Sequence, residues 1–100
     1  MNPTREGLDS LPGSEIVLAG ITDLEAGRES VDSNAVLMAS RRLRAAGVEI
    51  PSAEAEPSAA SHRLYELLAA DDARNAHSRY NAIVGRLVSF ARAAERARGR

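Results

Sequence analysis

The hydrophobic positions of residues 73–94 repeat as they do in an α-helix with one buried face. Successive apolar residues are separated by 3, 4, 3, 4, 3 and 4 positions, which is the spacing of an a/d seam. The seam consists of Ala73, Ala76, Tyr80, Ile83, Leu87, Phe90 and Ala94. This pattern predicts a helix over residues 72–97 on which the other helices pack, with Leu87 as a buried anchor.

Two further amphipathic segments lie in the first half of the chain. A helix is expected over residues 14–26, because Ser14 suits the N-cap position and Gly27 follows where a helix commonly ends. A second helix is expected over residues 31–46, with Ser30 as its N-cap. Both segments place their apolar residues on one side, as helices that contribute to a shared core do.

A third helix is expected over residues 58–70, since Pro57 is well tolerated at the first turn of a helix. No Gly or Pro separates it from the last helix, so the sequence leaves open a single long helix. The two apolar faces are out of phase, because continuing the last seam backwards leaves Leu64 outside it. Phase favours a break at Asp71–Asp72, with one of these aspartates capping the last helix.

The rest of the chain reads as connections within one domain of 100 residues. Residues 1–13 are rich in Pro and Gly and are expected to form a flexible N-terminal arm. Residues 48–57 form an acidic, proline-containing linker that crosses the bundle through Val48 and Ile50, and residues 98–100 form a frayed basic tail. The predicted fold is all-α, a small antiparallel bundle of about four helices.

Composition removes several kinds of chemistry. The chain has no Cys and no Lys, so all thirteen of its basic residues are Arg. Lysine Schiff bases, cysteine nucleophiles, disulfides and cysteine metal sites are therefore excluded. An Ala- and Arg-rich chain without Lys is typical of a GC-rich bacterial genome. No apolar run is long enough to cross a membrane, so we expect no membrane partner and a cytoplasmic location.

Charge is divided unevenly along the chain. Residues 1–60 hold five Arg and ten acidic residues, whereas residues 61–100 hold eight Arg and four acidic residues. The two parts therefore carry net charges of −5 and +4. They can attract each other within the fold or across a dimer, or the second part can present a basic surface to an acidic partner.

No catalytic or metal-binding motif is apparent. His62 and His77 match no metal-ligand spacing, and the acidic residues Asp71 and Asp72 are better explained as helix caps. A nucleophile, a base and an oxyanion donor cannot be assembled from these residues. We therefore predict no catalytic residues, no cofactor and no metal, and expect a protein that is not an enzyme.

A partner is expected on the polar side of the last helix. Gly85 lies there. A Gly inside a helix costs about 1 kcal/mol relative to Ala, and such a glycine often marks the close approach of another backbone. The end of the seam at Phe90 is also expected to protrude, because one short helix cannot cover the whole seam. The predicted partner-binding residues are Arg74, Ser78, Asn81, Gly85, Phe90, Arg92 and Arg96.

These observations give two functional hypotheses. The first is a small non-enzymatic protein–protein interaction module that docks a helical surface on itself, as a homodimer, or on another protein. The alternative is an accessory protein that binds nucleic acid through its Arg-rich second half. The acidic first half and the scarcity of aromatic residues for base stacking count against nucleic acid.

Overall fold

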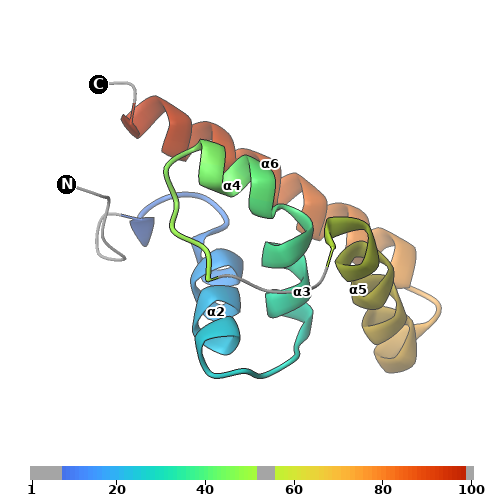
Figure 1. Ribbon diagram of the computed structural model, residues 1–100. Helices are drawn as coiled ribbons and strands as arrows, with labels where there is room; N and C mark the ends of the chain where they lie inside the picture. The colour runs from blue at the N-terminus through green and yellow to red at the C-terminus, as the bar shows by residue number, and fades with distance from the viewer. Residues whose placement is uncertain (1–7, 52–55, 99–100) are drawn as a thin grey trace.

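The computed structural model describes residues 8–51 and 56–98, and it confirms the all-α helical bundle (Figure 1). Over these residues the chain forms five helices and no strand. The helices are α2 (Ser14–Glu25), α3 (Val31–Met38), α4 (Ser40–Ala45), α5 (Pro57–Asp72) and α6 (Ala76–Arg98). The long helix α6 runs along the top of the view, above α2 and α3.

The short helix α3 lies at the centre of the bundle. It packs against α2, α5 and α6, and Figure 1 shows it between α2 and α5. Its residues Ala35 and Val36 are completely buried, and Ser33 and Asn34 are nearly so. A helix buried on several sides has no single apolar stripe, so the central position of α3 could not be predicted from the spacing of its apolar residues. The other helices α2, α3 and α5 do pack on α6, as expected, but the central position in the bundle belongs to α3.

Ser30 begins α3 as predicted. Its hydroxyl oxygen accepts a hydrogen bond from the backbone N–H of Ser33 at 3.0 Å, and its own N–H donates to the Ser33 hydroxyl at 2.8 Å. This reciprocal pair is a capping box, which satisfies backbone donors at the start of the helix. The Ser30 hydroxyl also donates to the carboxylate of Asp23 at 2.7 Å, which ties the end of α2 to the start of α3.

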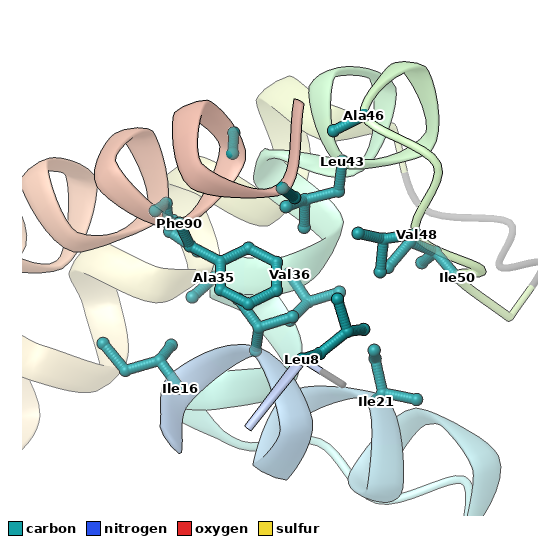
Figure 2. Close-up of a cluster of buried hydrophobic side chains, with 14 of the residues drawn as sticks. Leu8, Ile16, Ile21, Ala35, Val36, Leu43, Ala46, Val48, Ile50 and Phe90 are labelled. Carbon is teal, nitrogen blue, oxygen red and sulfur yellow. The ribbon is translucent and has the colours of Figure 1, made fainter. Parts of the chain in front are cut away.

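The helix predicted over residues 31–46 is two helices. The backbone leaves the helical conformation at Ala39, where φ is −97° and ψ is 10°. The change of direction lets α4 extend alongside α6 (Figure 1), where Arg42 pairs with Glu95. Leu43 of α4 and Ala46, directly after it, belong to the core (Figure 2). Tertiary packing therefore overrides the continuous amphipathic pattern at this point.

The start of α2 differs from the prediction. Gly13, with φ of 81°, precedes the helix, and Ser14 is its first residue rather than its cap. The Ser14 hydroxyl donates instead to the carbonyl of Asp9 at 2.9 Å. Residues 1–7 of the predicted arm lie outside the described residues, but Leu8 is only 6% exposed and belongs to the core. Within the expected arm, Leu8 and Gly13 are thus buried, while Asp9, Ser10 and Pro12 are exposed.

Two separate helices, α5 and α6, are confirmed, but the turn between them lies later than predicted. It occupies residues 73–75, so Ala73 is exposed in the turn and is not a seam position. Neither aspartate caps α6, because Asp72 ends α5 and Asn75 directly precedes α6. The Asn75 amide donates to the Asp72 carboxylate at 2.8 Å, which fastens the turn.

The core joins all five helices to the segment after α4 (Figure 2). Val48 and Ile50 are buried, which confirms that the predicted linker crosses the bundle; its residues 52–55 lie outside the described residues. Leu87 is 4% exposed, which confirms its predicted burial. Phe90 is fully buried and points from α6 toward Ala35 and Val36 in Figure 2.

Candidate functional site

An apolar groove of about 300 Å³ lies beside α6, opposite the junction of α3 and α4 and next to α5. We call it the α6 groove. Its lining consists of Met38, Ala39, Arg42, Ser61, Tyr80, Val84, Leu87, Val88 and Ala91. Four helices thus contribute to one open surface, and the kink at Ala39 forms part of one wall.

Regular spacing on α6 builds one wall of this groove. Tyr80, Val84 and Val88 are four residues apart, and such residues form a ridge along one side of a helix. Val84 and Val88 are half-buried, while Leu87 and Ala91 behind them are buried. The groove therefore has a packed floor and an apolar rim that solvent still reaches.

Tyr80 is held in place by two hydrogen bonds at the bottom of the groove. Its hydroxyl donates to the thioether sulfur of Met38 at 3.3 Å and lies 2.6 Å from the hydroxyl of Ser61. Either hydroxyl can be the donor in the contact between Ser61 and Tyr80. The Tyr80 ring also lies 5.7 Å, centroid to centroid, from the ring of Tyr65. Tyr65 is 39% exposed, so it extends the apolar surface beyond the groove.

The surface beyond the opposite end of the groove is basic. Continuing the ridge in steps of four leads to Arg92 and Arg96, which are both exposed. Arg42 lines the groove and pairs with Glu95 at 3.5 Å. Arg92, Glu95 and Arg96 also line a shallow depression of about 330 Å³. Within residues 8–51 and 56–98, Arg92 and Arg96 form no ion pair, so this end carries an excess of positive charge.

The structure separates the predicted partner-binding residues. Arg92 and Arg96 lie about one and two turns beyond Val88 on α6 and line the shallow depression, not the α6 groove itself. Ser78, Asn81 and Gly85 are exposed, and the Asn81 amide lies 3.2 Å from the His77 ring. Arg74 is exposed in the turn before α6 and does not belong to that helix.

Phe90 was wrongly predicted to face a partner. Its side chain is completely buried within the chain, and Ala94 is 4% exposed. Core residues of α2, α3 and α4 together cover this end of the seam, whereas the prediction considered one short helix at a time. Burial removes Phe90 from any surface available to a partner.

Among the residues that the structure describes, no other backbone comes close to Gly85. A Cβ atom added at this position would meet nothing within 4 Å. Gly85 lines a second depression of about 560 Å³, together with Ala82, Arg86 and Ser89 of α6 and with Leu11, Pro12, Gly13 and Glu15. This surface contains small and polar groups and lies on a different side of α6 from Val84 and Val88.

Ion pairs link the acidic first part of the chain to the basic second part. Arg63 donates to the Glu29 carboxylate at 2.8 and 3.1 Å, and Arg86 pairs with Glu15. The hydrogen bonds from Arg63 hold the pKa of Glu29 below its usual range. These contacts show that the uneven charges attract each other within the fold.

The α6 groove offers contact surface rather than reactive groups. Its polar members are the hydroxyls of Ser61 and Tyr80, which bond to each other, and the guanidinium of Arg42. Across the described part of the chain, no group of three or more His, Cys, Asp or Glu residues could hold a metal ion. Nor does any helix there combine the length and apolarity needed to cross a membrane.

Sequence reasoning missed the contribution of Met38, Ala39 and Ser61 to this surface. These residues come from two separate stretches, 38–39 and 61, and no local pattern brings them to α6. Val84 is not one of the a/d seam positions, although its place at the edge of the apolar face marks the groove. Comparisons with protein-family models, with curated proteins and with solved structures found no match to this chain.

Proposed function

We propose that this protein is a non-enzymatic protein–protein interaction module whose docking surface is the α6 groove. The observation that supports this proposal is the groove itself, an open apolar surface with the half-buried rim residues Val84 and Val88. The exposed ring of Tyr65 enlarges it. Apolar surface that remains open beside a packed core is typical of protein interaction sites, and tyrosine is frequent among residues that dominate binding.

The predicted homodimer loses its original physical basis. It rested on a protruding end of the seam, but Phe90 and Ala94 are buried within one chain. The α6 groove is also hollow, and a two-fold dimer places the same patch of both copies together. Two hollow surfaces do not fill each other, so a protruding element of a different polypeptide suits the groove better.

Nucleic acid remains the second candidate. The exposed side chains of Arg92 and Arg96, which form no ion pair with a described residue, favour it, as does the exposed Arg41 of α4. Phosphate contacts would make affinity fall steeply as salt concentration rises, whereas apolar docking in the groove would change little. Salt dependence of binding therefore separates the two candidates.

The test uses two matched arginine substitutions on adjacent residues of α6. Val88→Arg places a charge in the groove, and Ser89→Arg places the same charge beside the second depression. Each tagged variant is used to capture partners from cells that encode the chain, and captured proteins are identified by mass spectrometry. Each candidate partner is then purified and titrated against the three chains by calorimetry.

We expect a purified partner that binds the unsubstituted chain and Ser89→Arg with similar affinity and binds Val88→Arg at least tenfold more weakly. Circular dichroism and thermal unfolding confirm that both variants are folded. Binding that is equal for all three chains would refute the groove as the docking surface. Binding of a DNA or RNA oligonucleotide that disappears with rising salt would support the second candidate instead.

A further inference from the structure

We infer that the α6 groove accepts an amphipathic helix of a different protein, whose acidic side chains lie at the end beside Arg92 and Arg96. This inference rests on the proposed docking function and adds the chemistry and the direction of the partner. Three features of the described residues carry it: the length of the apolar ridge, the charge at one end, and the lack of a matching element on the chain itself.

The dimensions of the ridge suit a helix. From Tyr80 to Val88 the ridge spans about 12 Å at 1.5 Å per residue, which is a little more than two helical turns. A partner helix presents apolar residues at i, i+3, i+4 and i+7 over the same length, as helices that bind in apolar grooves do. The side chains of such a helix can lie between the ridge and the wall formed by Met38 and Ala39.

Charge gives the groove a direction. Beyond one end of the groove, Arg92 and Arg96, together with the lining residue Arg42, stand against the carboxylate of Glu95, which leaves an excess of two positive charges. At the other end, the lining groups are the neutral hydroxyls of Ser61 and Tyr80. Opposite charges across an interface steer association and fix the register of the partner. Acidic residues therefore belong at the arginine end of the bound helix.

A second copy of this chain does not supply such a helix. Among the described residues, Tyr65 is the exposed large hydrophobic side chain, and it borders the groove that needs to be filled. The outward side of α6 presents the small or polar residues Ser78, Ala82 and Ser89. No apolar ridge of the described surface therefore matches the groove.

The test is a selection from a displayed library of helical peptides. Each peptide has Leu at positions i, i+3, i+4 and i+7, and its flanking positions are randomised among acidic, basic and neutral residues. The same library is selected on the full chain, on the Arg92→Glu/Arg96→Glu variant and on the Val88→Arg variant. Individual peptides are then synthesised, and their dissociation constants are measured by fluorescence anisotropy at two salt concentrations.

On the unsubstituted chain we expect enrichment of Asp and Glu at one end of the peptides. On Arg92→Glu/Arg96→Glu we expect enrichment of Arg and Lys at that end, and acidic peptides should bind this variant about tenfold more weakly. Docking in the groove would be refuted if the peptides bound Val88→Arg and the unsubstituted chain with equal affinity. It would also be refuted if the selection enriched no peptide.

Peptides that require Val88 but show no charge preference would refute the acidic partner and leave groove docking intact. Sedimentation equilibrium of the free chain provides a further check, because a dimer that Val88→Arg dissociates would identify a second copy as the occupant. Competition by a DNA oligonucleotide, with no peptide dependence on Val88, would assign the arginines to nucleic acid.

Discussion

The hydroxyl oxygen of Tyr80 lies 2.6 Å from the hydroxyl oxygen of Ser61, and this contact joins α6 to α5 at the bottom of the α6 groove. The same Tyr80 hydroxyl donates to Met38 of α3. One side chain thus connects three helices, and the groove keeps its shape because these helices stay together. The sequence pattern placed Tyr80 in the a/d seam, and the structure shows that Tyr80 also lines the groove.

Replacing Tyr80 by Phe tests this connection. The variant keeps the ring but loses both hydrogen bonds, so we expect unfolding free energy to fall by about 0.5–1.5 kcal/mol per lost bond. Urea denaturation measures the loss. Ser61→Ala and the double variant complete a thermodynamic cycle, and strictly additive losses would show that the two hydroxyls do not interact.

Two glycines inside helices form a second, matched test. A Cβ atom at Gly20 of α2 would overlap the Asp32 carbonyl and a methyl group of Val36, whereas a Cβ at Gly85 would meet nothing. Gly20→Ala should destabilise by about 1–3 kcal/mol through overpacking. Gly85→Ala should stabilise by up to about 1 kcal/mol, because Ala is the better helix former. If both substitutions moved the denaturation midpoint in the same direction, the described packing would be contradicted.

Features of the fold that depend on local sequence signals were predicted, whereas features that depend on contacts between distant segments were not. The a/d spacing correctly predicted Leu87 as buried, and Ser30, Gly27 and Pro57 correctly marked helix ends, because these signals are local. The kink at Ala39 depends on contacts between distant segments, which no local pattern records. Phe90 is a position of the same a/d seam as Leu87, but its complete coverage requires several helices at once and was therefore not predicted. The groove was missed for the same reason.

Unfolding should depend on pH through Glu29. Hydrogen bonds from Arg63 lower the pKa of the folded Glu29 carboxyl. This group therefore adds stability above the ordinary glutamate pKa of about 4.3, and that contribution is lost as pH falls through the lower folded pKa. Glu29→Gln should flatten the acid side of the stability profile.

The control for this pH effect is Arg63→Gln. In that background, Glu29→Gln should change the profile little, because the hydrogen bonds that lower the Glu29 pKa are already absent. Denaturation midpoints measured across the acidic range provide both profiles. An unchanged profile for Glu29→Gln in the original chain would show that this ion pair does not persist in solution.

Truncation of Leu87 tests the core beneath the groove. Leu87 is 4% exposed, so Leu87→Ala should cost about 2–5 kcal/mol of unfolding free energy, as for other buried leucines. Val88→Ala, one residue further and half-buried, should cost less. A loss below about 1 kcal/mol for Leu87→Ala would mean that the seam is packed differently.

The docking function is tested most directly by the amide NMR spectrum of the chain as a groove-selected acidic helical peptide is added. We predict that the largest shift changes fall on the amides of Ala39, Val84, Val88 and Arg92, and that Gly85 and Ser89 change less. The largest changes on Gly85 and Ser89, with the groove amides unmoved, would contradict binding in the α6 groove.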